Sequence, residues 1–208
     1  AYRRQRQMCI RDRRYASGQG LTLWLHPQDP WLAQGAVVAA GAYADRLGLQ
    51  GLPPQAETLA LQTIFELQRA TGARVHLSRL SSAAGLELLR AARREGLPVS
   101  ADVSVHSLLL TDVDIGYFDT NFHLTPPLRG QRDREAIQAA LRDGLVDALC
   151  SDHTPVDTAG KAAPFPLSQP GATGLELLLS LTLKWARDNR IPLPQALARV
   201  TTGPAAVL

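Results

Sequence analysis

The stretch that decides the fold is Val-Asp-Ala-Leu-Cys-Ser-Asp-His-Thr-Pro at residues 146–155. Its first five residues are mostly apolar and predict a short buried strand, and Asp152 and His153 follow where that strand ends. In α/β enzymes, the chemistry collects at the carboxyl ends of parallel strands. An acid at this position can bind a metal or move a proton, but it can also cap the next helix. The spacing alone leaves both interpretations of Asp152 open.

The segments around this stretch alternate between strand-like and helix-like patterns. Short apolar runs predict further strands at residues 21–25, 74–78 and 98–103. Periodic apolar residues predict helices at 56–71, 83–95, 133–143 and 174–188. Residues 31–55 are expected to form a long loop with a short helix, Ser81 or Ser82 to cap the second of these helices, and Asp133 to cap the third. Pro194 is expected at a helix start.

Four strand–helix units in sequence predict a parallel α/β fold, either half of a TIM barrel or a small doubly wound sheet. No glycine-rich phosphate loop follows any of the strands. This absence disfavours a dinucleotide or nucleoside triphosphate site.

The basic charge of the chain comes from its first residues. The formal net charge is +3, but residues 1–14 carry six arginines against one acid, so residues 15–208 sum to −2. This basic N-terminal segment, residues 1–14, lacks the apolar core of a signal peptide and the pattern of aromatic residues that stack on nucleic-acid bases. Part of it, Arg-Gln-Arg-Gln-Met-Cys-Ile-Arg-Asp-Arg at residues 4–13, looks like translated sequencing adapter. We expect residues 1–14 to be non-native, residues 15–208 to form one partial barrel domain, and no nucleic acid to be a partner.

The remaining composition is that of an ordinary globular protein, with 45% hydrophobic and 20% charged residues. No apolar run approaches the roughly 20 residues that span a bilayer. The two cysteines form neither a disulfide framework nor a Cys-x-x-Cys metal site. These features favour a cytoplasmic protein that does not bind membranes.

Several predicted strands end in polar residues of the kind that metals use. His26 follows the first strand, His76 lies within the second with Arg79 just after it, and Asp152 ends the fourth. Two histidines and an aspartate could hold zinc if the strand ends share one face of a barrel. A lone histidine is more often packed or on the surface, and that is the expectation for His76, His106 and His123. For His26 and Asp152, the two interpretations are evenly balanced.

From about residue 21 to the end, the chain resembles the second half of a dihydroorotase-type amidohydrolase. The matching stretches run in the order of that family, and together they are specific where one alone would not be. They are His-Pro-Gln-Asp at 26–29, Leu-Gly-Leu-Gln-Gly-Leu-Pro at 47–53, Ala-Glu at 56–57, Leu-Ser-Ser at 80–82, Leu-Leu-Leu-Thr-Asp at 108–112, Pro-Pro-Leu-Arg at 126–129, Asp-Gly at 143–144, Ser-Asp-His-Thr-Pro at 151–155 and Gly-Ala-Thr-Gly-Leu-Glu at 171–176. The resemblance implies a TIM-barrel amidohydrolase fold of which about the second half, βα units 5–8, is present.

Active members of that family resemble one another in a two-zinc mechanism, in which a bridging hydroxide attacks a cyclic amide. A strand-end aspartate carries the proton to the leaving nitrogen. The resemblance places that aspartate, also a metal position, at Asp152 and one histidine ligand at His26.

Three other functional positions depart from the family pattern. The next histidine ligand falls on Arg79, which is permanently charged and has no lone pair for a metal. Two substrate-binding positions, an asparagine and a histidine in the family, fall on Thr125 and Val156. A register slip that makes His76 the ligand is the alternative, but Leu-Ser-Ser at 80–82 fixes the register against it. Zinc is therefore expected to be absent or weakly bound.

The resemblance implies a non-catalytic dihydroorotase-like protein that accompanies aspartate transcarbamoylase in de novo pyrimidine biosynthesis, within an oligomeric assembly. The first alternative is an active zinc-dependent dihydroorotase or related cyclic amidase, which uses His26, Asp152 and residues outside this segment. The second is a small-ligand binder that uses the vestigial pocket. Half a barrel also leaves sheet edges and an apolar face uncovered, so the chain alone is expected to aggregate or to pair with another copy.

Overall fold

The computed structural model describes the backbone of residues 2–208 and the side chains of residues 10–208. Its centre is a sheet of four parallel strands in the order β1-β4-β5-β6. The strands are β1 (Thr22–Leu25), β4 (Arg74–Leu77), β5 (Val99–Ser104) and β6 (Ala148–Cys150). Since neighbours in the sheet follow one another in sequence, the topology is that of a partial barrel, as the sequence predicts.

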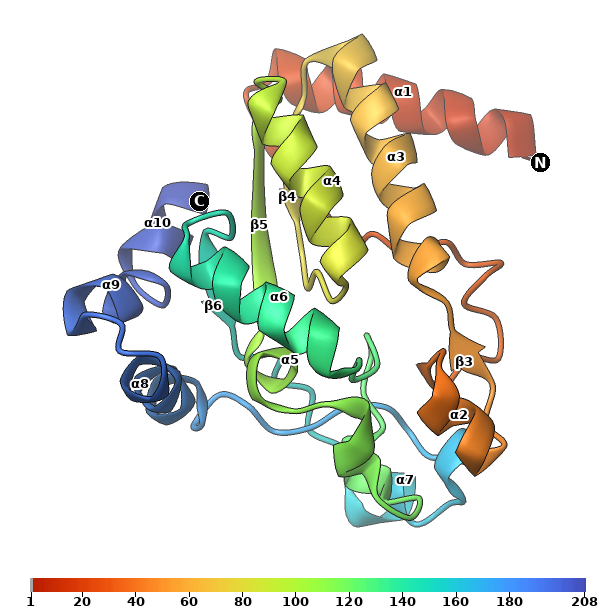
Figure 1. Ribbon diagram of the computed structural model, residues 1–208. Helices are drawn as coiled ribbons and strands as arrows, with labels where there is room; N and C mark the ends of the chain where they lie inside the picture. The colour runs from red at the N-terminus through yellow and green to blue at the C-terminus, as the bar shows by residue number, and fades with distance from the viewer. Residues whose placement is uncertain (1) are drawn as a thin grey trace.

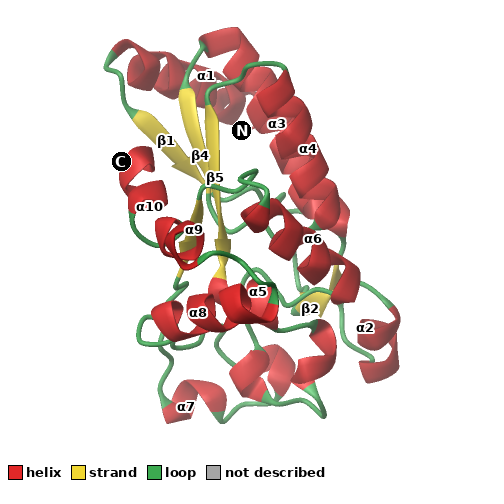
Figure 2. Ribbon diagram, turned by 60° about the vertical axis from the view of Figure 1, so that its left-hand side comes forward, coloured by secondary structure: helices red, strands yellow, loops and turns green. Residues whose placement is uncertain are grey.

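Three long helices lie on one side of the strands and cover that face of the sheet (Figures 1 and 2). They are α3 (Pro54–Thr71), α4 (Ala83–Arg94) and α6 (Gln131–Arg142). Each connects two neighbouring strands, so each unit is a βαβ crossover. The core between these layers holds fully buried leucines from both, among them Leu77, Leu89 and Leu141.

The rest of the chain packs at the two ends of the sheet. The helix α1 (Tyr2–Gly18) lies near the amino ends of the strands, and α8 (Leu178–Asp188), α9 (Leu193–Ala198) and α10 (Thr202–Val207) follow β6 (Figure 1). At the carboxyl ends lie α5 (Val105–Leu109), α7 (Thr158–Lys161) and three short 3-10 helices, η1 (Asp112–Ile115), η2 (Thr120–Phe122) and η3 (Phe165–Leu167). The described helices include none that is long and apolar enough to cross a bilayer.

Most of the elements expected from the sequence are present, with shifted ends. Ser82 caps α4 by accepting a hydrogen bond from the Gly85 N–H, and Pro194 lies in the first turn of α9, as predicted. The expected helix from residue 174 begins only at Leu178. The expected loop at 31–55 contains a short helix, α2 (Ala42–Leu47), as predicted. It also contains a second pair of parallel strands, β2 (Val38–Ala39) and β3 (Gly51–Leu52), and the sequence did not indicate these strands.

The structure describes only part of the N-terminal segment that is expected to be non-native. The structure places residues 2–18 in α1, but the side chains of residues 1–9, Cys9 included, lie outside the described part. The non-native origin of residues 1–14 therefore stays a prediction.

The prediction that Asp133 caps its own helix is wrong. The helix α6 begins at Gln131 after Gly130, so Asp133 already lies in its first turn. Its Oδ1 atom instead accepts a hydrogen bond of 2.8 Å from the N–H of Ala83, the first residue of α4. Asp133 therefore satisfies a free N–H at the start of a neighbouring helix, which local sequence cannot show.

Replacing Asp133 with alanine should lower the free energy of unfolding by about 1 kcal/mol, because it removes a carboxylate from a helix amino terminus. Urea unfolding measures the change. Arg132→Ala, at an exposed position in the same turn, is the control and should change the free energy by less than about 0.5 kcal/mol. Equal effects of the two variants would contradict the role of Asp133 in α4.

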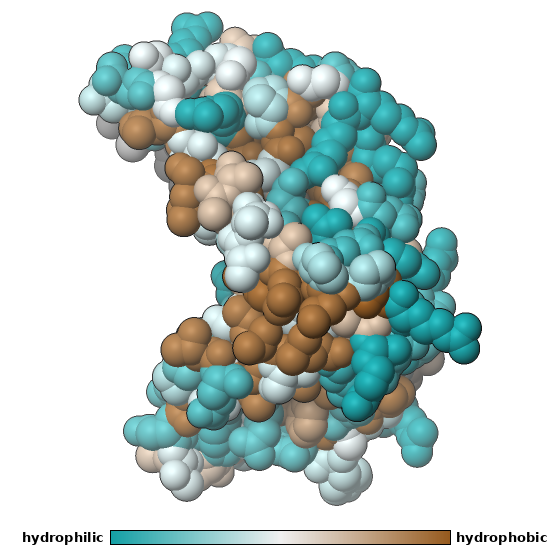
Figure 3. Space-filling model, turned by 90° about the vertical axis from the view of Figure 1, so that its left-hand side faces the viewer, coloured by the Kyte–Doolittle hydropathy of each residue, from teal (hydrophilic) through white to brown (hydrophobic). Residues whose placement is uncertain are grey.

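Exposed apolar side chains mark one face of the molecule. Figure 3 shows them gathered in the middle of the face that α8 to α10 present, beside a hollow. Leu175, Leu179 and Leu183 recur at a spacing of four residues and are 65%, 52% and 39% exposed. On β1, an edge strand of the sheet, Trp24 is 52% exposed. The expectation of an uncovered apolar face is thus consistent with the structure.

Candidate functional site

The candidate site lies at the carboxyl ends of β4 and β6. Arg79 follows β4 and Asp152 follows β6, and both have left-handed backbone conformations, with φ of 58° and 48°. Side chains other than glycine rarely adopt this region, and such residues gather at functional sites. In each case the positive φ turns the chain sharply out of the strand.

The side chains of these two residues meet. The Nη1 atom of Arg79 donates to Oδ1 of Asp152 at 3.1 Å and to the carbonyl oxygen of Thr125 at 2.9 Å. The Asp152 side chain is only 10% exposed and that of Arg79 is 29% exposed. Asp152 does not cap the next helix, because Asp157 is the cap of that helix and the Asp152 carboxylate bonds Arg79 instead. Its role as a metal ligand or proton carrier stays a prediction.

A buried aspartate that the sequence analysis missed supports Arg79 from below. Asp102 lies on β5. Its Oδ1 atom accepts a hydrogen bond of 2.8 Å from the backbone N–H of Arg79, and its Oδ2 atom lies 2.8 Å from Nε2 of His76. The other ring nitrogen of His76, Nδ1, is 2.8 Å from Oγ of Ser100. His76 is 1% exposed. This histidine is therefore a packed residue, as expected, and its hydrogen bonds give no support to the alternative that makes it the metal ligand.

His26 lies at the end of β1 as predicted, but this chain engages both of its ring nitrogens. Nδ1 donates to the carbonyl oxygen of Ser78 at 3.0 Å, and Nε2 is 3.1 Å from Oε1 of Gln28. In the described part of the chain, His26 makes no hydrogen bond or ion pair with Arg79 or Asp152. The sequence prediction therefore places His26 correctly at the strand end, while the interacting pair consists of the other two residues.

A cavity of about 240 Å³ opens beside the Arg79–Asp152 pair. The residues that line it come from the ends of two strands and from two loops. They are Arg79, Leu124, Thr125, Asp152, Thr154, Pro170, Gly171 and Ala172. Thr125 thus lines the cavity at its predicted position. Val156 does not: it lies beyond Thr154, and its Cγ atoms approach Gly160 and Gly171. The prediction that Val156 marks the substrate position has no support from this lining.

Titratable groups near the pair lie in a desolvated environment. Burial raises the pKa of the Cys150 thiol well above its usual value, and the charges of Asp102 and Asp152 raise it further. Burial also lowers the pKa of His106, against an opposing effect of Asp152. Both groups are therefore neutral at physiological pH. His106 and His123 are each 6% exposed, which agrees with the expectation that they are packed.

Three of the stretches that carry the family resemblance meet in a buried network. The carboxylate of Glu57, 4% exposed, accepts hydrogen bonds from the backbone N–H and the hydroxyl of both Ser81 and Ser82, at 2.6–3.1 Å. Arg129 donates from Nε to the Ser81 hydroxyl at 2.8 Å. The network joins the start of α3 to the start of α4 and to the loop before α6. These residues hold the fold, and none of them reaches the cavity beside Arg79.

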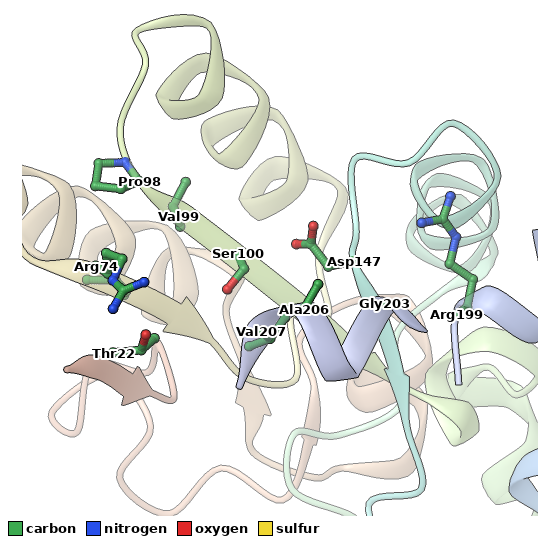
Figure 4. A pocket seen from close by; sticks show the side chains of 11 residues that line it. Thr22, Arg74, Pro98, Val99, Ser100, Asp147, Arg199, Gly203, Ala206 and Val207 are labelled. Carbon is green, nitrogen blue, oxygen red and sulfur yellow. The ribbon is translucent and has the colours of Figure 1, made fainter. Parts of the chain in front are cut away.

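A second cavity, of about 330 Å³, lies at the opposite, amino end of the sheet (Figure 4). Its charged lining residues, Arg74, Asp147 and Arg199, come from separate elements. The Asp147 carboxylate is already bonded by Arg93 and by the Ala101 N–H, and Arg74 bonds the carbonyl oxygen of Gly20. Polar residues at this end of a barrel serve stability, whereas the chemistry belongs at the carboxyl end.

The residues at the strand ends do not fit a zinc centre. Arg79 stands where the resemblance expects a histidine ligand, and its guanidinium has no lone pair to donate. That cation is bonded to Asp152, the carboxylate that a metal would need. Among the described residues, no three His, Cys, Asp or Glu side chains form a group that could hold a metal ion. Absent or weak zinc binding remains a prediction.

Comparison of the sequence with known proteins shows the family of this chain. The chain is 42% identical over 194 residues to a dihydroorotase-like protein of Pseudomonas putida, across 93% of this chain and 46% of that protein. It is 38% identical over 195 residues to a dihydroorotase of Anaeromyxobacter dehalogenans, across 93% of this chain and 45% of that protein. The chain thus spans about half the length of the curated relatives that it matches. No family model matches it.

Solved structures share the fold. A D-hydantoinase from Bacillus sp. AR9 superposes with a TM-score of 0.82 at 20% identity, over 96% of this chain and 46% of that one. A dihydroorotase from Saccharomyces cerevisiae superposes with a TM-score of 0.73 at 17% identity, over 92% of this chain and 51% of that one. The expected half of an amidohydrolase barrel is therefore confirmed. The chain belongs to the dihydroorotase-like proteins.

Proposed function

We propose that this chain is part of a cytoplasmic dihydroorotase-like protein that has lost catalysis and serves as a structural partner of aspartate transcarbamoylase in pyrimidine biosynthesis. The observation that carries the proposal is the contact between Arg79 and Asp152. A proton-transferring aspartate must be free to accept a proton from the attacking water and to release it to the leaving nitrogen. Here a guanidinium bonds that carboxylate and occupies the position of a metal ligand.

The buried network around Glu57 supports the same proposal from the opposite direction. It retains the stretches that fix the barrel, while the strand-end site has changed at Arg79 and Thr125. A fold can be kept while its site is altered, because fold and site are separable, and this pattern fits a protein that contacts a partner through its surface. The curated relatives named dihydroorotase-like, from two Pseudomonas species, are each 42% identical to this chain.

We expect the whole protein to co-purify with the catalytic subunit of aspartate transcarbamoylase and to hydrolyse no dihydroorotate. Size-exclusion chromatography of the mixed proteins, with and without each partner, tests the assembly. Failure to associate under any condition that keeps both proteins folded would remove the partnership. The loss of catalysis is tested separately, so one part of the proposal can fail without the other.

The alternative is an active zinc-dependent dihydroorotase or related cyclic amidase, and it is favoured by the positions of His26 and Asp152 at strand ends. Metal analysis and a hydrolysis assay on the whole protein distinguish the two functions. Arg79→His restores the ligand type that the family has and is the informative variant. Stoichiometric zinc with turnover in the unaltered protein would overturn the non-catalytic proposal, whereas zinc that appears only in Arg79→His would support it.

A further inference from the structure

The guanidinium of Arg79 has one edge that this chain uses and one that it leaves open. Its Nη1 atom donates both side-chain hydrogen bonds, to the carbonyl oxygen of Thr125 and to Asp152. Within the described residues, neither Nε nor Nη2 has a hydrogen-bond partner. These two nitrogens carry parallel N–H groups, and that edge of a guanidinium matches the two oxygens of a carboxylate.

From this open edge we infer that Arg79 has replaced the metal as the positive charge of the site, and that the cavity beside it binds a small carboxylate. The inference does not depend on the proposed partnership, because it concerns only the strand-end cavity. The cavity of about 240 Å³ is large enough for a molecule of a few heavy atoms and is lined by Arg79 itself.

The position of Arg79 is fixed before any ligand arrives. Its backbone N–H is held by the buried carboxylate of Asp102, and its Nη1 atom is held at the far edge of the guanidinium. A side chain whose rotamer is already restricted loses little entropy on binding, which favours affinity. The strained left-handed backbone at φ 58° is a further sign that this position is maintained for the site.

The remaining lining supplies donors and one opposing charge. Thr125 and Thr154 are exposed residues of the lining, and their hydroxyls have no hydrogen-bond partner among the described residues. Asp152 is the only acid in the lining, and it is paired with Nη1 of Arg79, away from the open edge. Asp102 lies below the site and is engaged by His76 and by the Arg79 N–H. An anion at the open edge therefore meets donors, and its repulsion from Asp152 is partly compensated.

Malonate, with malonamide as its uncharged counterpart, is the probe, and the full chain in its soluble assembly is the sample. We expect malonate to bind with a dissociation constant on the order of 1 mM and to shift the Arg79 Nε–H resonance in a saturable way. Malonamide should bind at least about tenfold more weakly, since it lacks the negative charge. Arg79→Gln should reduce malonate affinity at least about tenfold.

Two further variants keep the test decisive. Arg79→Lys retains the charge without the two parallel N–H groups, so it should weaken malonate binding even if Arg79→Gln fails to fold. Arg46→Gln removes an exposed arginine of α2 and should leave malonate affinity unchanged. Equal affinity for malonamide, an unchanged affinity in Arg79→Gln or Arg79→Lys, or the absence of a saturable shift at Arg79 would each overturn the inference.

Discussion

Replacing Glu57 with glutamine is expected to lower the free energy of unfolding by about 3–5 kcal/mol, because it breaks a buried charged network. The carboxylate accepts four hydrogen bonds, from the backbone and hydroxyl of Ser81 and Ser82. A glutamine side chain has the same shape but directs an NH₂ group at two of those donors. The donors then remain buried without acceptors, and each such group costs about 1–3 kcal/mol.

Urea unfolding of the chain measures this effect, with the midpoint and slope fitted for each variant. Glu66→Gln is the matched control, since Glu66 lies on the same helix with its side chain 73% exposed and paired only with Arg69. That surface pair contributes less than about 1 kcal/mol. A loss of stability for Glu57→Gln that is no larger than for Glu66→Gln would show that the network does not hold α3 and α4 together.

The sequence was sufficient for the parts of the fold that depend on local chemistry. Apolar runs located the four strands of the sheet, and Ser82 and Pro194 marked helix starts as predicted. The short strands β2 and β3 have only two residues each, so no periodicity could reveal them. The start of α8 at Leu178 was not predicted either; Gly174, where the helix was expected to begin, lies directly against the backbone of Ser151 and leaves no room for a Cβ.

The site was predictable to a similar extent. The sequence placed Arg79 and Asp152 after two different predicted strands, and the structure brings their side chains together across the intervening strand β5. Asp102 was missed, because a polar residue inside an apolar strand gives no sign of its partner, which lies 26 residues away on β4. Asp133 was assigned to the wrong helix for the same reason: the N–H that it bonds is 50 residues away in sequence.

We expect the chain on its own to self-associate, with an average mass in solution of at least twice 22.5 kDa. The physical reason is an uncovered apolar surface next to an unpaired strand. Leu175, Leu179 and Leu183 form an exposed stripe along α8 and the segment before it, and β1 leaves one edge without a neighbour in the sheet. Exposed apolar stripes and free strand edges favour association with another chain.

Light scattering coupled to size-exclusion chromatography tests this expectation, and charges introduced into the leucine stripe identify the surface. The double variant Leu179→Glu, Leu183→Glu should weaken association at least about tenfold, since full burial of an exposed leucine contributes up to about 1.5–3 kcal/mol and these two exposed leucines would be buried in the contact. Leu59→Glu, on α3 and 46% exposed, is the control for an added charge at an exposed leucine. If the control weakens association as much as the double variant, the contact does not involve α8. If the unaltered chain is a monomer that unfolds cooperatively, the exposed stripe does not cause self-association, and the partial barrel is stable with this apolar surface exposed to solvent.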